Sequence, residues 1–249
     1  MKMTNENVWE HFYKKNESFS LGFSYYIFGI FGKEVDEDKI WKDGERIISL
    51  LHPKKNDKIL DACCGSFGRI TIPAAKRNLR VTSVDISPTA IKLLKNRLER
   101  FKLSKKCILR KADVKKLPFS NNYFDKVFLL NTPHFQDLDK IIKEISRVTK
   151  KNGLLFINFK NSESFANYFY KNPFFQRILV GKIKMYFYPL DELKRNFTKY
   201  GLQIVDAYSV FSPFPFYMNL PLTLKQRIMK RAHGLYTNAH TWDLLIKKL

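Results

Sequence analysis

The chain has 249 residues, of which 45% are hydrophobic and 15% are aromatic. This composition excludes an intrinsically disordered protein and is enough to build a sizeable hydrophobic core. The formal net charge is +22, which attracts nucleic acid, an anionic lipid surface or an acidic substrate. The alternative is that the charge serves no partner and that the lysines are simply spread over every solvated face.

The cysteines and the N-terminal sequence indicate the compartment. Cys63, Cys64 and Cys107 form no CxxC motif, and two adjacent cysteines do not cross-link a fold, which favours a reducing compartment. Because the first residues also lack the features of a signal peptide, we expect a cytoplasmic protein. The uncharged residues 18–32 are short for a membrane span, and we interpret them as a core helix, with an interfacial helix as the alternative.

The predicted elements alternate between strands and helices in the middle of the chain. Residues 1–50 have helical spacing of apolar side chains, and Pro53 ends this region. The predicted strands are residues 58–62, 80–85, 107–111, 124–131 and 154–159. Three helices are predicted between them: the first ends near residue 77, the second runs from 88 to about 102, and the third runs from 138 to 149. Ser87 and Pro88 have the residue types of an N-cap and a first helical position, and residues 151–153 predict a turn.

After residue 160 the pattern is less regular. It predicts a helix at 189–200, a strand at 202–210, a second helix at 222–233 and a closing edge strand at 241–248. The alternation before residue 160 is typical of an α/β fold, in which a parallel sheet carries helices on both faces.

Acidic and amide side chains stand where the predicted strands end. Asp61, Asp85 and Asn131 end the first, second and fourth strands, and Asp113 follows the third. Because ligands bind outside the carboxyl ends of parallel strands, we expect these side chains to share one site. A carboxylate such as Asp85 suits the two hydroxyls of a ribose, although a helix-capping role is the alternative for one aspartate alone. The three acids together favour a nucleoside.

The loop after the first strand separates two kinds of nucleoside site. A dinucleotide-binding loop would read G-x-G-x-x-G, whereas this loop has two glycines, Gly65 and Gly68, and an acid, Asp61, before the turn. A pyrophosphate is repelled by that acid, whereas a positively charged sulfonium tolerates or uses it.

Four segments carry a family resemblance. They are ILDACCGSFGR (59–69), VTSVDIS (81–87), ADVKKLPFSNNYFDKVF (112–128) and RVTKKNGLLFI (147–157). In order and spacing they resemble the motifs of class I S-adenosylmethionine-dependent methyltransferases, and the small-molecule branch with the quinone methyltransferases is the most similar. The resemblance implies a Rossmann-like, seven-stranded, mostly parallel sheet with helices on both faces, an N-terminal helical lid, and S-adenosylmethionine as the cofactor.

The resemblance also implies roles by position. Residues 61–65 would line the methionine moiety, Asp85 would bind the ribose hydroxyls, Ile86 would pack on the adenine and Asp113 would accept from its amino group. The implied cofactor-binding residues are Asp61, Ala62, Cys63, Gly65, Gly68, Asp85, Ile86, Asp113, Val114, Asn131 and, with Trp9 in the lid, Tyr13. Gly68 would allow close approach at the helix start, and Asn131 would contact the methionine end. No metal site is predicted.

The sequence departs from the family pattern at two positions. Cys63 stands where the first glycine is usual, and Phe67 is an additional residue before Gly68. We interpret Cys63 and Cys64 as small packing residues rather than redox or nucleophilic groups.

A base is needed only if the acceptor must lose a proton, because a sulfonium methyl group is already activated. His134 follows the fourth strand and is the candidate base, with a structural histidine as the alternative. Residues 165–188 hold nine aromatic side chains, and residues 211–217 hold a second group. These would form a wall for an apolar acceptor, a stacking surface for RNA, or a plain core.

We therefore predict a single methyltransferase domain over residues 1–249. It comprises a helical cap at 1–50, a cofactor-binding core at 55–160, and an acceptor region with closing strands at 161–249. The predicted function is methyl transfer to a small apolar or aromatic acceptor, and peripheral membrane contact would accompany a lipophilic one. The alternatives are an RNA methyltransferase and a regulatory protein that binds S-adenosylmethionine without catalysis.

Overall fold

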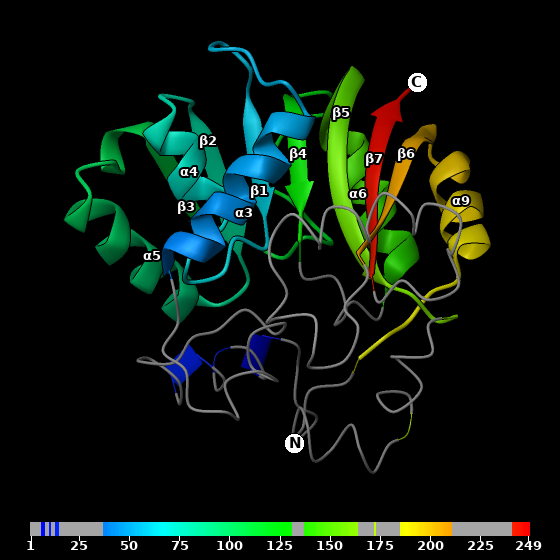
Figure 1. Ribbon diagram of the computed structural model, residues 1–249, viewed down its shortest axis with the longest axis horizontal. Helices are drawn as coiled ribbons and strands as arrows, with labels where there is room; N and C mark the ends of the chain where they lie inside the picture. Colours follow the sequence, from blue (N-terminus) through cyan, green and yellow to red (C-terminus); the bar gives the residue numbers. More distant parts are fainter. Residues whose placement is uncertain are drawn as a thin grey trace, which may run out of the picture.

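The computed structural model describes residues 6–7, 10, 13–14, 37–130, 137–163, 172, 185–210 and 241–249. The uncharged segment at 18–32, the predicted helix at 222–233 and most of the two aromatic segments lie outside the described residues. Within the described part, Figure 1 shows one central sheet with helices packed against it.

The sheet has seven strands in the order β3-β2-β1-β4-β5-β7-β6. The strands are β1 (Ile59–Ala62), β2 (Val81–Asp85), β3 (Cys107–Lys111), β4 (Phe124–Leu129), β5 (Thr149–Lys160), β6 (Leu202–Val210) and β7 (Thr241–Lys248). The first five pair in parallel, and β7 is antiparallel to both of its neighbours. The predicted α/β class with a mostly parallel sheet is confirmed.

Helices cover both faces of the sheet, as expected. They are α3 (Glu37–Leu50), α4 (Thr71–Lys76), α5 (Pro88–Arg100), a short 3-10 turn η1 (Ser104–Lys106), α6 (Leu138–Val148) and α9 (Leu190–Lys199). Side chains of α3, α4 and α5 pack on one face of the sheet, and those of α6 and α9 pack on the other. Neighbouring residues of β1 serve opposite faces: Ile59 packs with α3, and Leu60 packs on the side of α6.

Local sequence signals explain where α5 begins. The Ser87 hydroxyl accepts a hydrogen bond from the amide of Ala90 at 3.1 Å, and Pro88 occupies the first turn. The side chain thus satisfies one of the amides that have no partner within the helix, and the predicted N-cap is confirmed.

Two predictions about strands are wrong. The last strand is not an edge strand, because β7 pairs with both β5 and β6, and β6 forms the edge. Trp242, Leu244 and Ile246 of β7 are almost fully buried, and such a nearly continuous apolar run is typical of an interior strand. Residues 151–153 do not separate a helix from a later strand, because β5 already begins at Thr149 and these residues form an irregularity in its pairing with β4.

The parallel strands place all their carboxyl ends along one edge of the sheet. In Figure 1 this edge lies below, where the arrow of β4 points, and the loop that precedes β1 lies at the opposite edge. We call these the carboxyl edge and the amino edge. Among the helices that the structure describes, none is long and apolar enough to cross a membrane.

Candidate functional site

Asp85, the last residue of β2, joins two loops at the carboxyl edge. One carboxylate oxygen accepts from the amide of Gly65 at 2.9 Å, and the other accepts from the amide of Ser87 at 3.0 Å. The side chain is 6% exposed, and burial raises its pKa to about 6. The amide of Ile86 also acts to lower this pKa, so of the about four acceptor positions of an ionised carboxylate about one stays open to a hydroxyl of a ligand.

Asp61, the predicted acid before the turn, faces the start of α4. One carboxylate oxygen accepts from the Thr71 amide at 3.1 Å and from the Thr71 hydroxyl at 2.6 Å. The Thr71 hydroxyl also lies 2.7 Å from the Ser83 hydroxyl of β2. Burial raises the pKa of Asp61 to about 7 although these hydrogen bonds act against the rise. Asp61 therefore links α4 to β1 and β2, and no sequence motif indicated that Thr71 is its partner.

The loop between β1 and α4 has an unusual backbone. Cys63 has φ +63° and Gly65 has φ +60°, and both values lie in the left-handed region that favours glycine. Cys63 therefore keeps the conformation of the glycine that is usual at this position. A Cβ atom on Gly65 would lie 3.2 Å from the hydroxyl oxygen of Tyr13, so Gly65 and the N-terminal segment approach each other closely.

The adjacent cysteines lie among the acids of the site. Burial, together with the charges of Asp85 and Asp61, raises the pKa of the Cys63 and Cys64 thiols well above the usual value. Both thiols stay protonated near neutral pH. This favours the predicted packing role over a nucleophilic one, since the thiolate is the reactive form.

Gly68 allows a close approach at the start of α4. A Cβ atom at this position would lie 2.4 Å from Cδ1 of Leu94, a fully buried residue of α5. The absence of a side chain therefore lets α5 pack against the loop, and a contact of Gly68 with the cofactor stays a prediction.

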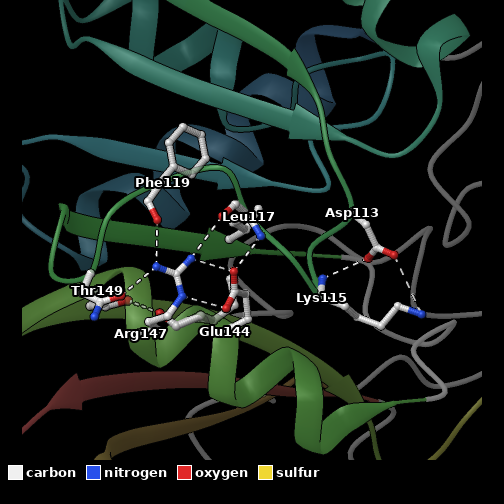
Figure 2. A network of polar contacts seen from close by, with 9 residues as sticks. Asp113, Lys115, Leu117, Phe119, Glu144, Arg147 and Thr149 are labelled. Carbon is white, nitrogen blue, oxygen red and sulfur yellow. Dashed lines mark hydrogen bonds and ion pairs between the residues drawn. The ribbon is translucent and has the colours of Figure 1, made fainter.

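Asp113 follows β3 and heads a loop that leads to β4 without a helix. Its carboxylate accepts from the amide of Lys115 at 2.9 Å and lies 3.9 Å from the Lys115 ammonium (Figure 2). The same ammonium pairs with Asp137 at 3.2 Å. The amide of Ala112 bonds to the carbonyl of Asp85 at 3.0 Å, which brings the loop beside β2. The Asp113 side chain is 39% exposed and can accept a further hydrogen bond from a ligand.

Arg147 of α6 binds the same loop through hydrogen bonds to its backbone. Its guanidinium donates to the carbonyl oxygens of Leu117 at 3.1 Å and Phe119 at 2.7 Å, and it pairs with Glu144 (Figure 2). Glu144 in turn accepts from the Leu117 amide at 2.6 Å. The predicted adenine-side residues are thus positioned by a network on α6 that the sequence motifs did not reveal.

The N-terminal segment reaches the same edge. Glu10 accepts from the Ser87 hydroxyl at 2.6 Å and from the Thr89 amide at 3.2 Å, at the start of α5. Although burial acts against it, these hydrogen bonds lower the pKa of Glu10 to about 2. Glu6 also pairs with Lys111 at 2.5 Å. Glu10 has the residue type preferred at a helix N-terminus, but its distance along the chain concealed the contact.

The predicted residues divide into three groups. Asp61, Asp85, Cys63, Gly65, Asp113 and the hydroxyl of Tyr13 gather at the carboxyl edge, and Ile86 lies half-buried beside them. The side chains of Ala62 and Val114 are in the hydrophobic core, so only their backbones can face a ligand. Asn131, His134 and Trp9 lie outside the described residues.

These features are the ones expected of a nucleoside-binding site in a Rossmann-like fold. Three carboxylates stand at the ends of three adjacent strands, beside a loop with a left-handed backbone. In the part of the chain that the structure describes, no group of histidine, cysteine, aspartate and glutamate side chains could hold a metal ion.

Comparison with known proteins identifies the kind of domain. Residues 60–157 match the family model described as a methyltransferase domain. The chain is 29% identical over 112 residues to the sterol 4-C-methyltransferase of Caenorhabditis elegans, covering 45% of this chain and 33% of that protein. It is 32% identical over 116 residues to a demethylmenaquinone methyltransferase of Lactobacillus johnsonii, covering 44% and 46% respectively. Residues 60–157 therefore form a methyltransferase domain, and the similarity to these relatives supports S-adenosylmethionine as the cofactor.

A solved structure extends the likeness in fold. A sarcosine dimethylglycine methyltransferase from Galdieria sulphuraria superposes with a TM-score of 0.62 at 16% identity, covering 91% of this chain and 97% of the other. At this identity the likeness concerns the fold. The chain spans less than half the length of the two curated relatives named above.

Proposed function

We propose that this chain transfers a methyl group from S-adenosylmethionine to a small apolar or aromatic acceptor. The observation that carries the cofactor half is Asp85, which is buried, bonded to the amides of Gly65 and Ser87, and still able to accept a hydrogen bond from a ligand. A ribose offers hydroxyl groups to this acceptor.

The residues present fit the cofactor in charge as well. Asp61, Asp85 and Asp113 lie at adjacent strand ends, where a ligand with a sulfonium and an ammonium group would be attracted. The Gly65 backbone has no side chain to obstruct a ligand, and the Tyr13 hydroxyl is next to it. We assign the ribose to Asp85, the adenine to Asp113 and Ile86, and the methionine end to residues 61–65, Tyr13 and Asn131.

When bound, S-adenosylmethionine supplies a methyl group that is already activated for displacement. The protein's own contribution is then to align the acceptor and to exclude water. The N-terminal segment suits the second task, because Glu10 fastens it to the start of α5 directly beside Asp85.

The relatives and the sequence support an apolar acceptor. The two curated relatives are named for a sterol and for demethylmenaquinone, which are both apolar molecules. Residues 165–188 and 211–217 are rich in aromatic side chains, and they connect elements that end at the carboxyl edge. We assign the acceptor to this region, and peripheral membrane contact would accompany a lipophilic acceptor.

His134 is the proposed base for acceptors that must lose a proton. It follows β4 in the chain, close in sequence to the carboxyl edge. We expect His134→Ala to lower kcat with labelled cofactor about 100-fold, the typical size of a general-base contribution, and to leave cofactor affinity unchanged. A variant with unchanged kcat would show that the histidine is structural.

The experiment that tests the function has two parts. Calorimetry with S-adenosylmethionine and with S-adenosylhomocysteine tests the cofactor half, and absence of binding at high micromolar concentration would refute it. An acceptor screen with methyl-labelled cofactor on fractionated cell extract tests the other half. Label in the lipid fraction is expected, and label in RNA would contradict the small-acceptor assignment.

A further inference from the structure

The amino edge of the sheet carries an excess of positive charge. Residues 76–111 contain twelve lysines and arginines and two acids, Asp85 and Glu99. Asp85 is buried at the other edge, so Glu99 is the exposed acid of this segment. Six of the basic residues lie in or beside the loops that precede β2 and β3, and we call them the amino-edge cluster: Lys76, Arg77, Arg80, Lys102, Lys105 and Lys106.

The two loops form one surface. The first residues of β2 and β3, Val81 and Cys107, are paired in the sheet. The Lys106 ammonium donates to the side-chain oxygen of Asn78 in the neighbouring loop. The Lys76 ammonium lies 5.3 Å from the centre of the Phe101 ring, which ends α5. The six cations therefore share a single region across the sheet from Asp85.

These cations are not neutralised within the described part of the chain. Some basic side chains elsewhere are paired, for example Arg97 with Glu37 and Lys150 with Asp125, whereas others, such as Lys140, form no ion pair among the described residues. The amino-edge cluster differs in that six such cations lie close together. None of the ion pairs found among the described residues includes a member of the amino-edge cluster.

Two helix ends compensate only a part of this charge. The carboxyl termini of α4 and α5 point to the cluster, and each contributes about half a negative charge. They offset about one of the six positive charges. Capping of helix ends is thus a reason for one or two of these cations and not for all six.

We propose that the amino-edge cluster binds the phosphate backbone of a single-stranded RNA. The loop before β1 adds Lys54, Lys55 and Lys58 against one acid, Asp57. Neighbouring strands are about 4.8 Å apart, so three adjacent loops span roughly 10 Å, which is the axial length of about three nucleotides. A row of this length suits a polyanion better than one small anion.

A membrane surface fits the cluster less well. The exposed large apolar side chains of the described residues are Ile108, Tyr123, Val205 and Leu249. None of them lies in the loops before β2 and β3, and one of them, Tyr123, lies beside the loop before β1, with its ring centre 4.0 Å from the Lys58 ammonium. Membrane-binding surfaces combine cations with apolar anchors. A bilayer at this edge would also lie across the molecule from the cofactor site, away from any lipophilic acceptor.

The binding surface is independent of the proposed reaction. It lies at the edge opposite Asp85, so the two can be tested and can fail separately. The test variant replaces three exposed residues of the cluster: Arg80→Gln, Lys102→Gln and Lys105→Gln. The matched control makes the same change of charge on α6 and α9, with Lys140→Gln, Lys143→Gln and Arg195→Gln.

The measurement is fluorescence anisotropy with a labelled oligouridylate of about 15 nucleotides, near the upper site size of a single-strand binding fold, over a series of salt concentrations. Each phosphate contact on a single strand contributes about 0.7 to the slope of log affinity against log salt. We therefore expect the cluster variant to lose about 2 from the slope and the control variant to keep the wild-type slope.

Three outcomes would overturn the proposal. The first is wild-type protein that does not bind the oligonucleotide at low salt. The second is an equal loss in both variants, which indicates net charge alone. The third is a cluster variant that loses binding to phosphatidylserine vesicles but retains RNA, which indicates a membrane surface. Calorimetry with S-adenosylmethionine on both variants checks that each is folded, and failure of the wild type to bind the cofactor would count only against the proposed methyl transfer.

Discussion

The two edges of the sheet differ in the charge that they carry and in how that charge is held. At the carboxyl edge, Asp61, Asp85 and Glu10 are fixed by hydrogen bonds from helix starts and loop amides. At the amino edge, the cations of the amino-edge cluster have no acidic partner among the described residues. The net charge of +22 is therefore not spread evenly over the described part of the molecule.

Helix polarity explains part of this difference. The starts of α4 and α5 lie at the carboxyl edge and their ends lie at the amino edge, so acids are stabilised at the first and cations at the second. Burial goes beyond that effect, because it raises the pKa values of Asp61 and Asp85 although both accept amide hydrogen bonds. A surface chosen only for stability would not bury acids at such a cost, and this points to a ligand at the carboxyl edge.

The largest expected effect comes from removing the acid at the end of β2. Asp85→Ala should weaken S-adenosylmethionine binding about 10- to 100-fold, since a hydrogen bond to a charged group contributes about 1.5–3 kcal/mol. The affinity of Asp85→Asn, which keeps an acceptor oxygen, should lie between that of Asp85→Ala and that of the wild type. Calorimetry measures both.

The control for Asp85 is Glu99→Ala, which removes an exposed acid from the segment of the amino-edge cluster. It should leave cofactor affinity within about twofold, because exposed charges are screened by solvent. Unchanged affinity in Asp85→Ala, measured on protein with a normal circular dichroism spectrum, would remove Asp85 from the site.

Two glycines with a left-handed backbone, one at each edge, allow the effect of packing on stability to be compared. Gly68 at the carboxyl edge has φ +55°, and a Cβ atom built on it would overlap Leu94. Gly201 before β6 has φ +68°, and a Cβ atom built on it would have no other atom within 4 Å. Both changes to alanine should cost about 1 kcal/mol for the left-handed backbone. Gly68→Ala should cost a further 1–3 kcal/mol or so from overpacking, measured by urea unfolding. Equal losses would mean that α5 can move aside.

The pH dependence should also differ between the edges. Burial raises the pKa of Asp61 to about 7 and that of Asp85 to about 6, so the folded chain binds more protons than the unfolded chain between about pH 4 and pH 7. Their contribution to the free energy of unfolding should increase as the pH is lowered from 7 to 5. Cofactor affinity should instead fall about tenfold over this range, because protonated Asp85 accepts fewer hydrogen bonds.

Asp125, near the amino edge, should affect the pH dependence of the free energy of unfolding in the opposite direction. Partial burial acts to raise its pKa, but hydrogen bonds from Lys150 and from the Lys58 amide hold the pKa below the usual value. Asp125→Asn should therefore remove a stabilisation that is present above the unfolded pKa and lost in acid. The lowered pKa of Asp125 places this loss below about pH 5. In urea unfolding, Asp125→Asn should therefore lessen the fall of the free energy of unfolding between about pH 5 and pH 3, whereas Asp61→Asn should lessen its rise between pH 7 and pH 5. A change of the same sign in both variants would contradict the assignment.

The smallest expected effect is the change in cofactor affinity when residues of the amino-edge cluster are replaced. The variant Arg80→Gln, Lys102→Gln and Lys105→Gln should bind S-adenosylmethionine within about twofold of the wild type, because the separation exceeds the range of screened charges. A change of tenfold in calorimetry would show that the two edges are coupled.

The sequence predicted the described core well where the signal was local. The strand periods, the Ser87 N-cap and the order of acids along the strand ends are all properties of short segments, and the structure confirms them. The place of β7 in the sheet depends on which strands pair, which short segments do not specify, although its apolar run at 242–246 was a sign of an interior strand.

The site was predicted less completely. Glu10 contacts Ser87 and Thr89 across more than 70 residues of chain, and Gly68 meets Leu94 of another helix. Such contacts depend on tertiary packing rather than on spacing. The roles of Asn131 and His134 stay predictions, since both lie outside the described residues.

The Arg147 network has a consequence for how the molecule opens locally. The loop from Asp113 to β4 lacks a helix, and one guanidinium with its partner Glu144 supplies many of its contacts (Figure 2). Segments held through a single shared anchor open cooperatively. We expect the amides of residues 115–121 to exchange with deuterium as one unit, and Arg147→Lys to accelerate that exchange while the strands on either side keep their protection.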